Sequence, residues 1–142
     1  MSKEVIVKVI GTQKSPDGEV STIEQTNGGT FAIQNDKKYL LYYEQSEENG
    51  EQVKNLVTIG TNEVIVSKSG AITTRMTFAK GKRYGIAYKT QFGEMLLDIF
   101  TKNLMIEERE DYIKITVDYN LELDSEVVSY CTISIECPEN KD

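Results

Sequence analysis

The sequence predicts an all-β protein, built as an antiparallel up-and-down β-barrel. Apolar and polar residues alternate along several segments, and turn-forming residues interrupt the 142-residue chain at short intervals. No segment combines a helical apolar stripe with a cap at its start and a glycine at its end. Strands joined by short connections favour a meander that closes as a barrel or splits into a sandwich, and we expect the barrel.

The clearest strand is the segment from Tyr112 to Asp124. Apolar side chains occupy its odd positions from Ile113 onward, and polar side chains occupy the even positions between them. Successive side chains of a strand point to opposite faces, so this pattern predicts one buried side and one wet side. The segments 72–78 and 84–90 alternate in the same way and are also predicted to be strands.

Nine clusters of turn-forming residues separate the predicted strands. Asn, Asp and Gly tolerate the positive φ that tight hairpins require, so these breaks indicate about ten strands. The clusters are Pro16–Gly18, Asn35–Asp36, Glu48–Gly50, Gly60–Asn62, Ser69–Gly70, Lys80–Gly81, Phe92–Glu94, Glu108–Asp111 and Asp124–Ser125.

Two segments are ambiguous by pattern alone. Asn27, Gly28 and Gly29 resemble a turn, but alternation continues on both sides, so we predict a bulge that bends one long strand. The segment 94–107 carries apolar residues on both faces and follows the turn at Phe92. We predict there a long strand buried on both sides rather than a helix.

The composition excludes several classes of function. With no histidine, the chain has no His-based acid–base or nucleophilic catalysis and no imidazole metal site. Its 23 acidic and 16 basic residues give a net charge of −7, which opposes binding to nucleic acid or anionic lipid. The sequence therefore predicts a non-enzymatic protein without metal or cofactor, and with neither a nucleic-acid nor a membrane partner. The alternative, an enzyme, would need chemistry based on Tyr, Arg, Lys or carboxylate side chains.

Length and cysteine usage complete this picture. A chain of 142 residues predicts one domain over 1–142, and the absence of a long apolar run predicts a cytoplasmic protein. Cys131 and Cys137 lie six residues apart on one predicted strand. That spacing holds them about 20 Å apart, too far for a disulfide. We expect one core thiol and one terminal thiol.

The chain also resembles the YwiB-like family of uncharacterised proteins from Gram-positive bacteria, a domain-of-unknown-function family. The resemblance runs from about Val5 to Ile135 and implies a lipocalin-like (calycin) β-barrel of eight to ten strands, cytosolic and without assigned activity. The signature Gly-x-Trp of secreted lipocalins is absent, since the chain has no Trp. The segments that carry the resemblance are Tyr39–Glu44, Lys68–Ile72, Arg75–Phe78 with Gly81, Tyr88–Gly93, Thr101 and Ile115–Tyr119.

The barrel interior is the candidate site. A barrel of about eight strands is either filled by side chains or holds one small ligand, and both alternatives stay open here. A hollow barrel would bind a small, partly apolar molecule. A filled barrel would act through its surface, as a protein-interaction or self-association module such as a homodimer. The residues predicted to line the interior are Tyr43, Met76, Phe78, Tyr84, Tyr88 and Tyr119.

Overall fold

The computed structural model describes residues 2–45 and 51–138, and every regular element in this part of the chain is a β-strand. The predicted all-β class is therefore confirmed. The ten strands are β1 (Ser2–Lys14), β2 (Val20–Gln34), β3 (Lys37–Gln45), β4 (Gln52–Ile59), β5 (Val64–Gly70), β6 (Thr74–Phe78), β7 (Arg83–Thr90), β8 (Gly93–Arg109), β9 (Tyr112–Leu123) and β10 (Glu126–Cys137).

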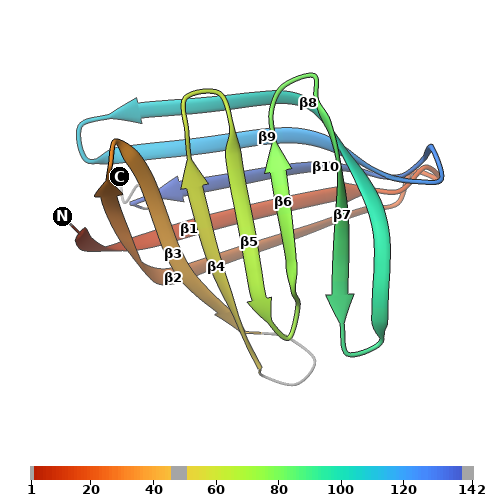
Figure 1. Cartoon of the computed structure of the whole chain (residues 1–142), viewed down its shortest axis with the longest axis horizontal. Coiled ribbons are helices and arrows are strands. Elements are labelled where there is room, and N and C mark those ends of the chain that lie inside the picture. The colour runs from red at the N-terminus through yellow and green to blue at the C-terminus, as the bar shows by residue number, and fades with distance from the viewer. Residues whose placement is uncertain (1, 46–50, 139–142) are drawn as a thin grey trace.

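All ten strands belong to one antiparallel sheet that curls into a nearly closed barrel. Its strand order is β6-β5-β4-β3-β2-β1-β10-β9-β8-β7, so strands that are consecutive in sequence pair with each other, except β6 and β7, and β10 returns to pair with β1. In Figure 1 the long strands β1, β9 and β10 run across the view behind β4 to β7, which run steeply in front of them. The predicted up-and-down barrel is confirmed.

The barrel has one seam, between β6 and β7. In the described part of the chain these two strands are joined only by the bridge between Thr73 and Lys89, where each N–H donates to the other's carbonyl oxygen at 2.9 Å. At the other end of the seam Gly81 N–H donates to the Thr101 carbonyl oxygen at 2.8 Å. The two edges of the sheet thus face each other, linked at one end by the bridge between Thr73 and Lys89 and at the other by the β6–β7 turn, which bonds to β8 through Gly81.

The predicted turns lie at or close to the strand boundaries where the structure describes them, although the turn predicted at Ser69–Gly70 falls within the last residues of β5 and the chain turns just after it. Asn35, Asp36, Asp124 and Ser125 all have positive φ, between 51° and 70°, as tight hairpin turns require. The predicted turn at 48–50 lies outside the described residues. Turn chemistry is a reliable signal in this chain because each hairpin connection is short.

Two predictions about individual strands are wrong in detail. β2 is one long strand as expected, but its register with β1 and β3 is continuous, so there is no bulge at Gly28 and Gly29. The register shifts occur elsewhere, in β8 between Thr101 and Asn103 and in β10 between Val127 and Ser129. β8 is the predicted long strand, yet Leu96 is 67% exposed, so the strand is not buried on both sides.

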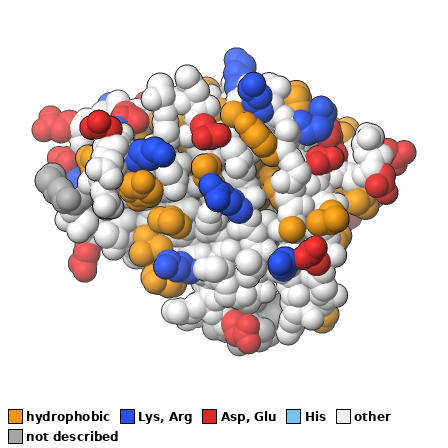
Figure 2. All heavy atoms as spheres, viewed as in Figure 1, with side chains coloured by type: hydrophobic (Ala, Val, Ile, Leu, Met, Phe, Trp, Pro, Cys, Tyr) orange, Lys and Arg blue, Asp and Glu red, His pale blue; other side chains and the backbone are white. Residues whose placement is uncertain are grey.

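Apolar side chains fill the middle of the barrel. Phe78 packs with its ring centroid 4.9 Å from that of Tyr119, and both side chains belong to the hydrophobic core. Fully buried members of this core come from strands all around the barrel: Val7, Leu40, Val57, Val64, Phe78, Ile99, Ile115 and Ile135. The space left for a ligand therefore lies toward the two ends. On the outer face in Figure 2, acidic and basic side chains are interspersed.

Candidate functional site

Two cavities lie at opposite ends of β3, one beside Lys38 and one beside Glu44. We call the first the hairpin-end cavity, because the β8–β9 hairpin forms one of its walls. We call the second the Lys68-end cavity. Their volumes are about 320 and about 400 Å³. Ligand cavities in proteins span about 300–1,000 Å³, so each has room for a small molecule only.

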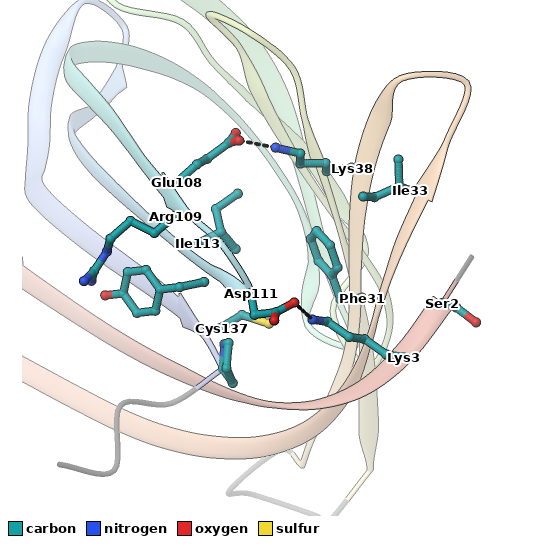
Figure 3. Close-up of a pocket in the computed structure, with 12 residues that line it drawn as sticks. Ser2, Lys3, Phe31, Ile33, Lys38, Glu108, Arg109, Asp111, Ile113 and Cys137 are labelled. Atoms are coloured by element: carbon teal, nitrogen blue, oxygen red, sulfur yellow. Dashed lines mark hydrogen bonds and ion pairs between the residues drawn. The ribbon is translucent and has the colours of Figure 1, made fainter.

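The hairpin-end cavity has an apolar floor that is continuous with the core (Figure 3). Ile113 and Cys137 form part of this floor and are 4% and 2% exposed. They pair in register on β9 and β10, which places both side chains on the inner face of the sheet. Phe31 and Ile33 add apolar surface from β2.

Two ion pairs cross the mouth of this cavity. Lys3 on β1 lies 2.7 Å from Asp111 in the β8–β9 turn, and Lys38 on β3 pairs with Glu108 on β8. Figure 3 shows the pairs on either side of Phe31 and Ile113. The β8–β9 hairpin is thus tied to the opposite wall of the barrel by contacts between segments far apart in the sequence. All four side chains are more than 30% exposed, so solvent screens these pairs.

The charged side chains around the hairpin-end cavity are mostly basic. Among residues 2–45 and 51–138, its lining holds the cations Lys3, Lys38 and Arg109 and the carboxylates Glu108 and Asp111, a net charge of +1 on a protein of net charge −7. Each lysine keeps an exposed ammonium at the edge of an apolar hollow. Chemically, this arrangement can hold an apolar group inside and an anionic group at the mouth.

The thiol of Cys137 is not activated. Burial raises its pKa to about 11, an effect that the charge of Lys3 opposes only in part. A thiol that stays protonated at neutral pH is a poor nucleophile and a poor metal ligand. Both cysteines are free and buried, so the prediction of no disulfide is confirmed, and Cys137, at the end of β10, belongs to the core as Cys131 does.

The Lys68-end cavity has a charged floor. Lys68 Nζ lies 2.7 Å from both Glu44 Oε1 and Asn55 Oδ1, and Asn55 Nδ2 donates to Glu44 Oε1 at 2.6 Å. Tyr88 lines the same cavity, and burial, assisted by the negative charge of Glu44, raises its pKa. Ile23 contributes apolar surface at the rim.

The six residues predicted to line the interior do not share one environment in the structure. Met76, Phe78 and Tyr119 are core residues, 7%, 0% and 8% exposed. Tyr88 is half-buried and lines the Lys68-end cavity, while Tyr84 is half-buried beside the seam between β6 and β7.

The prediction for Tyr43 is wrong. Tyr43 is 46% exposed, and its neighbour Tyr42 is 1% exposed and faces inward. The segment around them is apolar at consecutive positions, so alternation could not decide which tyrosine points inward. The position opposite on β2 decides it, because Gly29 leaves room for Tyr42.

Sequence reasoning missed both groups of charged residues at the barrel ends. Glu44 and Lys68 lie 24 positions apart, and Lys3 and Asp111 lie 108 apart. One signal was present in the sequence: Lys68 is in phase with Val64 and Val66, whose side chains are buried, so it shares their face of β5. No cluster of three or more His, Cys, Asp or Glu residues within 2–45 and 51–138 could hold a metal ion. Across the same ranges, no helix is long and apolar enough to cross a membrane.

Comparisons with known proteins agree with this fold. Residues 7–135 match the family model described as Domain of unknown function (DUF1934). The chain is 31% identical over 110 residues to the uncharacterised β-barrel protein YwiB of Bacillus subtilis, covering 78% of this chain and 76% of that protein. The crystal structure of YwiB superimposes with a TM-score of 0.85 at 26% identity, covering 99% of this chain and 94% of the other. The resemblance inferred from the sequence segments is confirmed.

Proposed function

Since the chain belongs to the family described as Domain of unknown function (DUF1934), we propose a function from its own geometry: it binds a small amphiphile with a carboxylate head group in the hairpin-end cavity. The apolar part of the ligand lies against Phe31 and Ile113. The carboxylate lies at the mouth, between Lys3 and Lys38. One observation carries the proposal: two lysines on different strands edge a single apolar hollow that opens to solvent.

A ligand carboxylate can replace a protein carboxylate in either of the two ion pairs at the mouth of the cavity. A ligand carboxylate can take the place of Asp111 at Lys3 or of Glu108 at Lys38, because both protein carboxylates are solvent-exposed and can return to water. Exposed ion pairs contribute about 0–1 kcal/mol, so releasing one costs little. Burying the apolar part of the ligand then contributes about 25 cal/mol per Å² to binding.

The filled middle of the barrel limits the ligand to a short chain or a single ring. Self-association through sheet edges, the alternative function, has less support. The two edges of the sheet, β6 and β7, face each other across the seam and are pinned there by the Thr73–Lys89 bridge. They present no long free edge to a second copy.

An NMR titration tests the proposal with octanoate and with its neutral analogue octan-1-ol. Octanoate should shift the amide signals of residues that line the hairpin-end cavity. These shifts should saturate as expected for one binding site per protein chain. The double variant Lys3→Gln/Lys38→Gln should weaken octanoate binding at least tenfold, about 1.4 kcal/mol, and leave octanol binding unchanged. Lys54→Gln, at an exposed position of β4, is the matched control and should bind as the unmodified protein does.

Two results of this titration would contradict the proposed carboxylate site. Octanoate shifts confined to other surfaces, or equal loss of octanoate and octanol binding in the double variant, would overturn the proposal. Native mass spectrometry of protein purified from its own host gives an unbiased view of the cargo. An added mass of a few hundred daltons that disappears on denaturation supports a bound amphiphile.

A further inference from the structure

The interior of the barrel is polar toward the Lys68 end. The register of β3 to β6 aligns Tyr42, Asn55, Lys68 and Thr74 in one row, so their side chains share the inner face. Asn55 is completely buried, and the Lys68 and Glu44 side chains are 18% and 20% exposed. Removing a charged pair from water to this extent is costly, so apolar residues would stabilise the fold at least as well.

The charged network leaves hydrogen-bonding capacity unused. Glu44 Oε1 accepts both from Lys68 and from Asn55, whereas Oε2 of the same carboxylate has no hydrogen-bond partner among residues 2–45 and 51–138. Glu44 lines the Lys68-end cavity, so one of its carboxylate oxygens is available to a donor there.

A second acceptor in the same cavity is also unsatisfied. Gln25 pairs in register with Val9 on β1, whose side chain packs against the core, so Gln25 also points inward. Its Oε1 atom is buried and makes no hydrogen bond to the described part of the chain. Buried polar atoms in folded proteins nearly always have a partner. An unpartnered acceptor that lines a cavity indicates an occupant that donates hydrogen bonds.

The charge and the apolar surface of the Lys68-end cavity indicate which class of ligand it can bind. Among the residues that the structure describes, the charged ones that line the Lys68-end cavity are Glu44, Glu51 and Lys68, with a net charge of −1. The rim carries the aromatic side chains of Tyr88 and Phe92, which favour a nearby cation. Phe92 is 83% exposed, so an apolar ligand group that covers it removes a large apolar surface from water.

We propose that the Lys68-end cavity is a second binding site, which takes a small primary amine with an aromatic or aliphatic body. The ammonium group donates to Glu44 Oε2 and Gln25 Oε1. The body of the ligand lies against Tyr88 and Phe92 at the rim. Lys68 is a positioning residue, because it holds Glu44 through Oε1 and so keeps Oε2 turned toward the ligand. This site is independent of the carboxylate site at the other end of the barrel.

Calorimetric titration with three matched probes tests the inference: 2-phenylethylamine, the neutral 2-phenylethanol and the anionic 3-phenylpropionate. The amine should bind with one site, and the alcohol at least tenfold more weakly. Gln25→Leu should weaken amine binding at least fivefold without lowering the thermal unfolding temperature, because the glutamine oxygen is unpartnered in the unliganded fold. Gln34→Leu, at an exposed position of the same strand, is the matched control and should leave binding unchanged.

A second variant separates charge from packing. Glu44→Gln keeps the size of the side chain and should abolish the preference for the amine over the alcohol. If this variant unfolds, Gln25→Leu still decides the question, since Gln25 belongs to no ion pair in the structure. Equal binding of amine and alcohol, tighter binding of the anion, or no heat of binding at millimolar amine would overturn the proposal. The last result would leave ordered water as the partner of Gln25.

Discussion

Gly29 on β2 and Tyr42 on β3 are direct partners in register, and a Cβ atom on Gly29 would lie 3.2 Å from the Cβ of Tyr42. The same Cβ would lie only 2.6 Å from the carbonyl oxygen of Leu41, a backbone atom that cannot move alone. Two strands of the barrel wall therefore approach each other as closely as they do only because position 29 has no side chain.

The substitution Gly29→Ala should therefore destabilise the protein by about 1–3 kcal/mol, since the backbone must shift to admit a methyl group. Gly28→Ala is a matched control, because nothing lies within 4 Å of a Cβ at that position and its effect should stay within about 0.5 kcal/mol. Urea unfolding of both variants measures the difference. Equal unfolding midpoints for the two variants would contradict the close approach.

Phe78 should act as a core residue and not as a ligand contact. Phe78→Ala removes a fully buried ring that packs against Tyr119, and we expect a loss of about 3–5 kcal/mol in the free energy of unfolding. Phe92→Ala provides the comparison, because Phe92 is 83% exposed and its removal should leave stability nearly unchanged. Thermal and urea unfolding report both effects, and a Phe78→Ala protein as stable as its parent would show that the barrel is hollow there.

The Arg83–Glu122 pair should make stability depend on pH. Arg83 Nε donates to Glu122 Oε1 at 2.7 Å, and this hydrogen bond holds the pKa of Glu122 below its ordinary value. A carboxyl group with a lowered pKa in the folded state stabilises the fold above the pKa of the unfolded state, about 4.3, and loses this contribution as the pH falls through the folded value. Glu122→Gln should therefore be less stable at pH 7 and lose less stability between pH 5 and pH 3.

A suitable control for that pH profile is Glu126→Gln, at an exposed position of β10. Its unfolding free energy should follow the unmodified protein across the pH range. If Glu122→Gln shows the same pH dependence as the unmodified protein, the ion pair does not contribute to acid sensitivity.

Both thiols should react slowly in the folded protein. Cys131 and Cys137 are 4% and 2% exposed, and burial raises the pKa of each. Alkylation by iodoacetamide at pH 8 should be slower by at least about two orders of magnitude than in urea, because only the exposed thiolate reacts. Mass spectrometry distinguishes the two labelled cysteines. Rapid labelling of Cys137 in the native protein would mean that the reagent reaches the floor of the hairpin-end cavity.

Local chemistry in the sequence was sufficient for most of the strand plan. The alternation from Ile113 to Leu123 depends only on the period of a strand, and the Asn35–Asp36 turn depends only on which residues accept positive φ. Both properties belong to a few consecutive residues, so tertiary packing had little to change. The prediction that failed at Tyr43 came from a segment where several consecutive residues are apolar, which leaves the inner face undecided.

The sequence by itself determined that this chain forms an antiparallel β-meander without histidine chemistry, because alternation, turn residues and composition are local or additive properties. Only the tertiary structure decided which charges meet. Lys3 and Asp111 become neighbours because β10 pairs with β1 and closes the barrel, bringing residues 108 positions apart to one mouth. Glu44, Asn55 and Lys68 meet because the strand register aligns them on the inner face, and register is fixed by packing across strands.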